Sequence, residues 1–222
     1  DGILILTLAN PPLNEITPSL LAALLAAIQS CPTGCRGIVL AAEAHNFSGH
    51  LPVEDAGGTA LAEACRAVED SAVPVVAVLQ GIVTGPGAEL ALAARARLAD
   101  PSLRLAFADV TLGLCPAGGT TRRLPRLIGA KAALRLLLSG KPVPASEALA
   151  LGLLDGLADS APVAAAARLA EALALGDLLP RPEPDVAAWK TALAGERGGP
   201  SARGRAAARI IDCVEAELIL TR

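Results

Sequence analysis

The sequence predicts an α/β fold, in which strands alternate with helices and right-handed crossovers connect parallel strands. Short apolar runs rich in β-branched residues recur along the chain between segments of helical composition. The run Val73–Leu79 is apolar throughout, which is typical of a strand buried on both faces of a parallel sheet. A chain of 222 residues, 53% of them hydrophobic, is long and apolar enough to bury the core of such a domain.

The chain begins with a predicted strand and helix. Ile3–Leu8 forms the strand, and the turn-forming residues of Asn10–Asn14 end it. Thr17 is suited to cap a helix with Pro18 at its first position, because proline lacks the N–H that goes unused there. The apolar run Leu20–Ile28 continues this helix.

The next segments repeat the alternation. Arg36–Ala41 is a short strand that leads into the loop Glu43–Gly58, where both histidines lie. The composition of Ala60–Val68 predicts a helix, and the buried strand described above follows it. Gly85-Pro86-Gly87 then interrupts the chain before a helix that begins at Ala88. This order predicts a strand, a turn and a helix at one edge of the sheet.

Further short elements follow. Leu98–Val110 predicts short strands, and Gly113–Thr121 is a turn-rich loop before the helix Ala130–Leu138. After Gly152–Gly156 the strand signals end, so the rest of the chain is expected to differ from the alternating part.

The last part of the chain is predicted to be helical. Ala161–Leu175 forms one helix, Pro180–Pro184 is a linker, and the residues from Val186 onward are helical around a glycine-rich interruption. We therefore divide the chain into a core domain, residues 1–175, and a C-terminal helical segment, residues 176–222.

Composition argues against two classes of partner. Aromatic residues make up 1% of the chain and the net charge is −3, so neither base stacking nor a basic surface for phosphates is supported, and we expect no nucleic acid. Even the apolar stretch Ala161–Leu175 carries Arg168 and Glu171, and no run reaches the roughly 18 residues that span a bilayer, so we expect no membrane span.

The cysteines indicate the compartment rather than a metal site. Five are present, and the closest two, Cys31 and Cys35, have no second Cys/His pair to complete a zinc site. The first residues lack the basic flank of a signal peptide. Reduced thiols in a cytoplasmic protein, with no metal bound, are the expectation.

Two carboxylates stand out. In Gln80–Leu92, Glu89 follows a flexible turn in the first turn of a helix, where free N–H groups can hold an anion; Glu89 can equally be a carboxylate that complements the helix dipole. The glycines do not form the G-x-G-x-x-G dinucleotide pattern. Asp109 is expected at a strand end, before the loop Cys115–Arg126, and alone it is a turn residue. If the two meet in space, they form an acid/base pair.

These residues carry a family resemblance. Gly81–Leu92 is similar to the strand, glycine triplet and x-Glu-Leu-Ala pattern of the enoyl-CoA hydratase (crotonase) family. Ala108–Gly113, followed by Pro116 and Gly-Gly-Thr, resembles its Pro-Glu-Val-x-Leu-Gly and Gly-Gly-Thr-Gln-Arg-Leu elements. Further matches in the same order, within roughly residues 3 to 157, are Asn10-Pro-x-x-Asn14, Asn46-Phe-Ser-Gly49, Leu138-Ser-Gly140, Ala145-x-Glu-Ala148 and Leu151-Gly-Leu153. The C-terminal helices resemble the hydratase part of multifunctional fatty-acid oxidation enzymes.

The resemblance implies a fold and a reaction. The fold would be a crotonase-like spiral of repeated β-β-α units with a C-terminal helical appendage, assembled as a trimer or a dimer of trimers. The protein would bind an acyl-CoA thioester and need no cofactor besides the coenzyme A of its substrate. Glu89 and Asp109 would be the two catalytic carboxylates that hold a water and deliver hydroxide to Cβ and a proton to Cα of a 2-enoyl thioester.

The family's oxyanion hole uses two backbone N–H groups. The resemblance places one at His50, after Gly49, although His50 can also be an exposed loop histidine. It places the other at position 86, where Pro86 has no N–H to donate. Other glycines that the resemblance places at the substrate are Gly85, Gly87 and Gly118.

These departures leave alternatives open. Asp109 is one methylene shorter than the family's glutamate, and Pro86 removes a donor, so an enoyl-CoA isomerase and a non-catalytic acyl-CoA binder stand beside the hydratase. Arg122, Arg123 and Arg126 are suited either to the phosphates of coenzyme A or to the solvated face of a helix.

Overall fold

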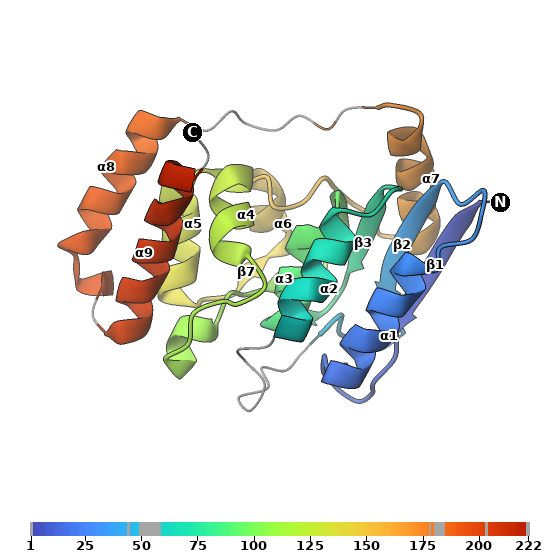
Figure 1. Cartoon of the computed structure of the whole chain (residues 1–222), viewed down its shortest axis with the longest axis horizontal. Coiled ribbons are helices and arrows are strands. Elements are labelled where there is room, and N and C mark those ends of the chain that lie inside the picture. Colours follow the sequence, from blue (N-terminus) through green and yellow to red (C-terminus); the bar gives the residue numbers. More distant parts are fainter. Residues whose placement is uncertain are drawn as a thin grey trace.

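The computed structural model describes residues 2–43, 45–48, 59–177, 179, 185–202 and 204–220. It confirms the α/β class, with a parallel main sheet, a smaller second sheet and helices around them (Figure 1). The predictions made for Gly49 and His50 fall outside the described residues.

The main sheet has the strand order β1-β2-β3-β5-β8, and its neighbouring strands pair in parallel. Its strands are β1 (Ile3–Leu8), β2 (Gly37–Ala42), β3 (Val75–Leu79), β5 (Ala96–Ala99) and β8 (Gly156–Leu157). The register of β1 on β2 runs from Ile3 opposite Gly37 to Leu8 opposite Ala42. The strands predicted at the start of the chain are therefore confirmed, and they lie side by side.

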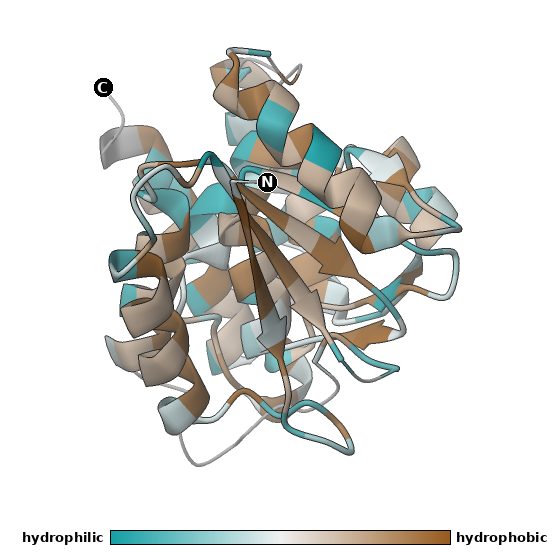
Figure 2. Cartoon of the chain, turned by 90° about the vertical axis from the view of Figure 1, so that its right-hand side faces the viewer, coloured by the Kyte–Doolittle hydropathy of each residue, from teal (hydrophilic) through white to brown (hydrophobic). Residues whose placement is uncertain are grey.

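The apolar run of β3 is buried on both faces, as its composition predicts. Val76 and Val78 pack in a cluster with Ala166 and Ala170 of α7 (Pro162–Ala174). The alternate residues of the strand, including Leu79, join the main core on the side of α1, α2 and α3. The strands accordingly appear as hydrophobic ribbons with helices on either side (Figure 2).

The helices on the main-core side are short and closely packed. They are α1 (Pro18–Gln29), α2 (Thr59–Glu69) and α3 (Pro86–Ala93), and α2 contacts both of the others. Thr17 caps α1 by accepting a hydrogen bond from the N–H of Leu20 at 3.3 Å, with Pro18 at the first position. This cap confirms the predicted start of the first helix.

The second sheet confirms a short strand within residues 98–110, but the end of that segment differs from the prediction. Its strands, β4 (Ile82–Val83), β6 (Arg104–Leu105) and β7 (Val143–Pro144), have the order β4-β6-β7. Asp109 does not end a strand, because it begins the 3-10 helix η1 (Asp109–Leu112). Backbone turns outweigh the β-branched composition here: Thr111 donates its N–H to Ala108 at 2.9 Å, and Gly113 ends the turn with a left-handed φ of 75°.

The helices after η1 include two that local patterns did not predict. They are α4 (Thr120–Ile128), α5 (Ala130–Ser139) and α6 (Ala145–Ala150), and only α5 was predicted. Pro125 inside α4 and Gly129 directly after it read as helix breakers. Packing decides this segment, since α4 buries Leu124 and contacts α3, α5 and α9.

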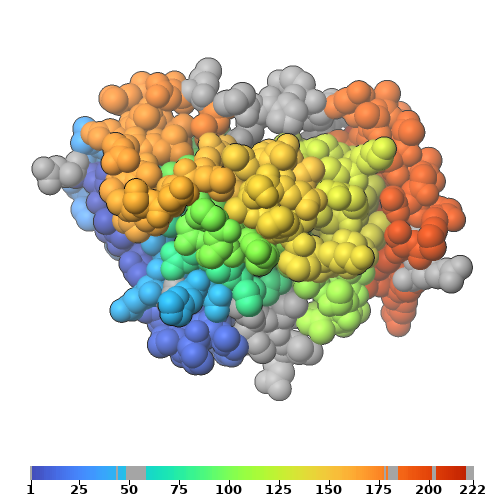
Figure 3. Space-filling model, turned by 180° about the vertical axis from the view of Figure 1, so that it is seen from behind, coloured from blue at the N-terminus to red at the C-terminus, as the bar shows by residue number. Residues whose placement is uncertain are grey.

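The C-terminal helices pack on α4 and α5. The segment contains α8 (Val186–Arg197), the 3-10 turn η2 (Pro200–Ala202) and α9 (Arg205–Leu220). Trp189, Leu193, Ile210 and Val214 of these helices join the main core. From behind, α7 lies beside the N-terminal strands, and α8 and α9 occupy the opposite end (Figure 3). None of the described helices is long and apolar enough to cross a membrane. The domain boundary at residues 175/176 stays a prediction.

Candidate active site

The start of α3 forms one wall of the candidate site. Gly85 caps the helix with φ 53° and ψ −131°, a conformation that requires glycine, and it is buried. Pro86 is the first helical residue and is half-buried. The first bond of the helix comes from the N–H of Glu89 to the carbonyl of Gly85 at 3.1 Å, so no bond is lost by having proline at position 86.

A second segment lies against this helix start. Ser48 pairs with Val83 in a parallel bridge, and the N–H of Thr84 donates to the carbonyl of Ser48 at 3.0 Å. A Cβ on Gly87 would lie 2.2 Å from the Cβ of Ser48, so only glycine fits at position 87. The structure thus explains Gly87 by close packing, and its contact with substrate stays a prediction.

Two hydroxyl groups at this junction were missed by sequence reasoning. The side chains of Ser48 and Thr84 are buried, and their hydroxyl groups find no hydrogen-bond partner among the described residues. A buried polar group without a partner costs about 1–3 kcal/mol, so such groups often face a ligand or water. Both residues lie within the family motifs, but the sequence alone gives neither hydroxyl group a role.

Glu89 lies almost fully inside the protein, with 2% of its surface exposed. The loop before α4 surrounds its carboxylate with donors: the N–H of Ala117 donates to Oε1 at 3.1 Å, and the N–H of Gly118 donates to Oε2 at 2.8 Å. Thr120 donates to Oε2 through its hydroxyl at 2.8 Å and its N–H at 3.3 Å. Four protein donors therefore hold one carboxylate in a defined position.

Glycines allow this loop to approach so closely. A Cβ on Gly118 would lie 3.0 Å from both the Cys65 thiol and Oε2 of Glu89. Gly119 has a left-handed φ of 98° as the residue that caps α4. The Gly-Gly-Thr motif is thus explained by the carboxylate that it surrounds, whereas the predicted contact of Gly118 with substrate is untested.

Asp109 is also buried, with 8% of its surface exposed. Burial raises the pKa of its carboxyl above the usual value, against a favourable bond from its own N–H. Burial likewise raises the pKa of Glu89; the N–H of Gly118 opposes this shift, and the charge of Asp109 adds to it. The fold therefore brings together the two carboxylates that lie 20 positions apart in the sequence, close enough for one charge to act on the other.

Two thiols border the carboxylates without the properties of nucleophiles. Burial, followed by the charge of Glu89, raises the pKa of Cys65 to about 12. Burial, followed by its neighbour Cys213, raises the pKa of Cys115 to about 12 as well. Both are protonated near neutral pH, and a thiol attacks only as its thiolate. In the described part of the chain, no group of three His, Cys, Asp or Glu side chains is placed to hold a metal ion.

The three arginines after the glycines have carboxylate partners within the chain. Arg122 and Arg123 both contact Glu69 at the end of α2, and Arg126 donates to Glu217 of α9 at 3.0 Å. Arg123 also donates to the carbonyl of Gly118. These pairs account for the arginines structurally, and their predicted use for coenzyme A phosphates is untested.

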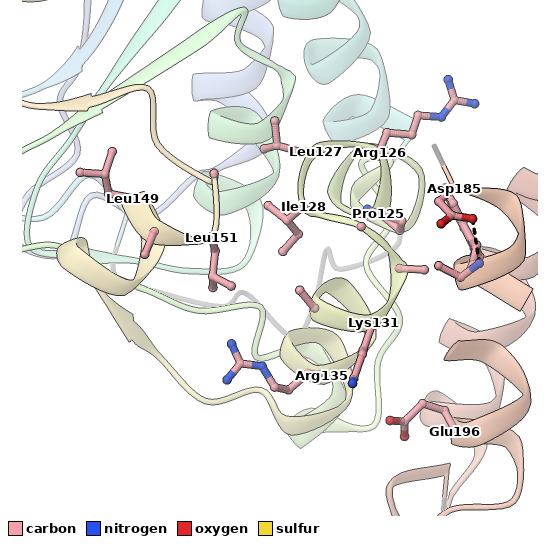
Figure 4. A pocket seen from close by; sticks show the side chains of 17 residues that line it. Pro125, Arg126, Leu127, Ile128, Lys131, Arg135, Leu149, Leu151, Asp185 and Glu196 are labelled. Carbon is pink, nitrogen blue, oxygen red and sulfur yellow. Dashed lines mark hydrogen bonds between the residues drawn. The ribbon is translucent and has the colours of Figure 1, made fainter. Parts of the chain in front are cut away.

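A groove of about 920 Å³ lies apart from the two carboxylates. It runs between α8 and the helices α4, α5 and α6, with Lys131 and Glu196 on facing walls (Figure 4). Leu127, Ile128 and Leu151 form part of its apolar floor. Neither Glu89 nor Asp109 lines it, so volume alone does not identify the reactive centre.

The arrangement around α3 is suited to proton transfer. Two neighbouring buried carboxyl groups with raised pKa values can exchange protons with a bound water or an acidic C–H nearer to neutral pH than ordinary carboxyl groups can. The first turn of α3 carries free backbone N–H groups, which give this end of the helix a partial positive charge.

Comparison with known proteins identifies the family of the chain. The profile of the enoyl-CoA hydratase/isomerase family matches residues 1–176. The chain is 36% identical over 191 residues to the peroxisomal bifunctional enzyme of Cavia porcellus, covering 81% of this chain and 26% of that protein. It is 33% identical over 188 residues to a probable enoyl-CoA hydratase of Bacillus subtilis (strain 168), covering 76% of this chain and 73% of that protein. The chain thus spans about a quarter of the bifunctional relative.

Solved structures share the fold. An enoyl-CoA hydratase from Mycobacterium avium subsp. paratuberculosis K-10 superimposes with a TM-score of 0.72 at 26% identity, covering 98% of this chain and 87% of that one. DspI of Pseudomonas aeruginosa gives 0.72 at 26% identity, covering 99% and 85%. These matches cover nearly all of this chain and confirm the predicted crotonase-like architecture.

Proposed function

Because the chain belongs to the enoyl-CoA hydratase/isomerase family, we propose that it binds an acyl-CoA thioester and adds water across the double bond of a 2-enoyl-CoA. The single observation that supports this best is that Glu89 and Asp109 are both buried and that the charge of Asp109 acts on Glu89. The proposed reaction uses no cofactor besides the coenzyme A of the substrate.

In the proposed mechanism, the two carboxyl groups hold a water beside the Cα–Cβ bond. One carboxylate accepts a proton from this water as its oxygen bonds to Cβ, and the π electrons move onto the thioester to form an enolate. The protonated carboxyl group then supplies the proton that completes Cα. The raised pKa values of Glu89 and Asp109 suit both halves of this exchange, because each group gains and loses a proton more evenly near neutral pH.

The enolate oxygen needs donors, and this site differs from its family there. The start of α3 faces the thioester in this proposal, but Pro86 supplies no N–H. The loss of one oxyanion donor typically lowers the rate about 10²- to 10³-fold. We therefore expect hydration to be slow, with the two carboxylates as the main catalytic groups.

Hydration of crotonyl-CoA tests the proposal directly. The absorbance of the conjugated thioester should fall with time, and Glu89→Gln or Asp109→Asn should each lower kcat about 10²-fold or more. Glu147→Gln is a matched control, because Glu147 is a surface carboxylate paired with Arg135 at 3.0 Å. An absence of turnover at high enzyme concentration contradicts the hydratase assignment.

An enoyl-CoA isomerase is the second candidate within the family. Glu89 accepts one hydrogen bond from the protein through Oε1 and three through Oε2, whereas no other described residue donates to the Asp109 carboxylate besides its own N–H. One accessible base is enough to move a proton between Cα and Cγ. Conversion of a 3-enoyl-CoA faster than hydration of a 2-enoyl-CoA would favour the isomerase.

A non-catalytic acyl-CoA binder is supported by Pro86 alone. Calorimetry would then show binding of a coenzyme A thioester by protein that has no measurable turnover. Turnover that disappears in Asp109→Asn contradicts this alternative.

Assembly and compartment remain proposals. We propose a homotrimer or a dimer of trimers, which sedimentation of the purified chain measures. The cytoplasm is likewise the proposed compartment, although several relatives are named as peroxisomal, and cell fractionation distinguishes the two.

A further inference from the structure

We infer that Arg123, paired with Glu69, is a positioning residue that holds the loop around Glu89 in place. The inference rests on the proposed catalytic role of Glu89 and extends it to two residues that do not touch the carboxylate. The family motifs assign no such role to Arg123, and the sequence alone favours only a phosphate contact or a solvated position for it.

The contacts form a short chain of hydrogen bonds that ends at Glu89. The Arg123 guanidinium donates to Glu69 at 2.7 Å and, through Nη1, to the carbonyl of Gly118. The N–H of Gly118 in turn donates to Oε2 of Glu89 at 2.8 Å. Gly118 is therefore held on one side by Arg123, while its other side binds the catalytic carboxylate.

The backbone is shaped to admit the guanidinium. Gly119 has a φ of 98°, and a Cβ there would lie 2.6 Å from Nη1 of Arg123. A residue with a side chain would thus be strained at position 119 and would push Arg123 off the Gly118 carbonyl. The glycine explains why Arg123 can reach this carbonyl with only 8% of its side chain exposed.

Glu69, where this series of hydrogen bonds begins, lies on a different helix from Arg123. Glu69 is the last residue of α2, and Arg123 lies in the second turn of α4, so their pair ties two helices together beside the site. The arginines beside Glu69 lower the pKa of its carboxyl, although burial acts in the opposite direction. The pair therefore keeps its charges near neutral pH, where the proposed reaction would run.

Arg122 provides a matched control, because it also pairs with Glu69. It contacts the same oxygen of Glu69, but its side chain is 35% exposed and it makes no contact with Gly118 among the described interactions. A surface ion pair of this kind contributes little stability. Arg122→Gln thus removes a neighbouring positive charge without removing the support of the loop.

The effect of losing Arg123 follows from the groups around Glu89. The charge of Asp109 on η1 acts on Glu89, and the charge of Glu89 acts on the thiols of Cys65 on α2 and Cys115 on the loop. Arg123 on α4 acts on Cys65 as well. Without Arg123, the Gly118 carbonyl loses its donor and the loop can move away from Glu89. Because the loop N–H groups favour the carboxylate, their loss raises the titration midpoint of Glu89 further.

The experiment compares Arg123→Gln, Arg122→Gln and wild type in two assays. With crotonyl-CoA, Arg123→Gln should lower kcat about 10²-fold, the typical effect of moving a catalytic group by about 1 Å, with little change in KM and with the acidic limb of the pH profile shifted upward. Titration of ¹³C-labelled Glu, with Glu89 assigned by Glu89→Gln, should show a higher midpoint for Arg123→Gln only.

The two assays separate this inference from the proposed function. If wild type does not hydrate crotonyl-CoA, the proposed reaction is wrong, but the titration still tests the support of Glu89. An unchanged midpoint in Arg123→Gln, or an equal shift in Arg122→Gln, overturns the inference. Arg123→Lys replaces Arg123→Gln if the latter does not fold, and its single ammonium should restore only part of the effect.

Discussion

Replacement of Pro86 by alanine tests how this site meets the charge on the thioester oxygen. Position 86 is the first residue of α3, and the helix closes its first bond from Glu89 to Gly85 at 3.1 Å. An N–H introduced at position 86 therefore has no partner inside the helix and stays free to donate outward. Pro86→Ala changes the donor count while α3 keeps its geometry.

The size of the effect follows from one added donor. Such a donor is worth about 10²- to 10³-fold in kcat, or roughly 2.7–4 kcal/mol, because the charge that it meets develops only in the transition state. The same substitution relaxes the unfolded chain and lowers stability by about 0.4–1 kcal/mol. A domain with about 5–15 kcal/mol of stability stays folded after a loss of this size, so the variant should fold and should catalyse hydration faster than wild type.

The assay is steady-state hydration of crotonyl-CoA at saturating substrate. Pro86→Ala should raise kcat with little change in KM, and the gain should vanish when Glu89→Gln is added, since the oxyanion donor cannot replace the acid/base group. A rise in kcat smaller than about tenfold, or about 1.4 kcal/mol, refutes the reasoning that places the thioester oxygen at the start of α3.

Two further predictions concern stability. Burial raises the pKa of the Asp109 carboxyl above its ordinary value of 3.8, so the folded state binds the carboxyl proton more tightly than the unfolded chain does. The folded state therefore loses stability as pH rises from the pKa of the unfolded chain through the higher pKa of the folded state. The Tm of Asp109→Asn should therefore exceed that of wild type near about pH 7, with the difference shrinking toward about pH 3.5, and a constant difference would contradict this. Gly87→Ala places a Cβ 2.2 Å from that of Ser48 and should destabilise the fold by about 1–3 kcal/mol or more in urea unfolding. Gly195→Ala in α8 meets no atom within 4 Å and should instead stabilise by about 0.5–1 kcal/mol; equal effects of the two changes would argue against the packing at Gly87.

The reliability of the sequence predictions differed between elements for a physical reason. The strand Val75–Leu79 and the helix that Thr17 caps were predictable because burial on both faces and capping leave local patterns in the residues. The helix Thr120–Ile128 was missed because Pro125 and Gly129 read as breakers, and only packing against α3, α5 and α9 overrules them. Asp109 was placed at a strand end for a similar reason, since the turn bonds that form η1 outweigh the strand-like composition of Val110 and Thr111.

Within the site, the sequence determines which reactive residues are present, and the tertiary structure determines how they are arranged. The sequence by itself determined the fold class, the family resemblance, the two carboxylates and the missing N–H at Pro86, because residue types and their order are local properties. Only the tertiary structure decided that four donors surround Glu89 and that Arg123 and Glu69 support the loop that carries three of them through its backbone. Those contacts join Glu69, Glu89 and the residues after Pro116, and no local pattern encodes an approach between segments that fold together only through the core.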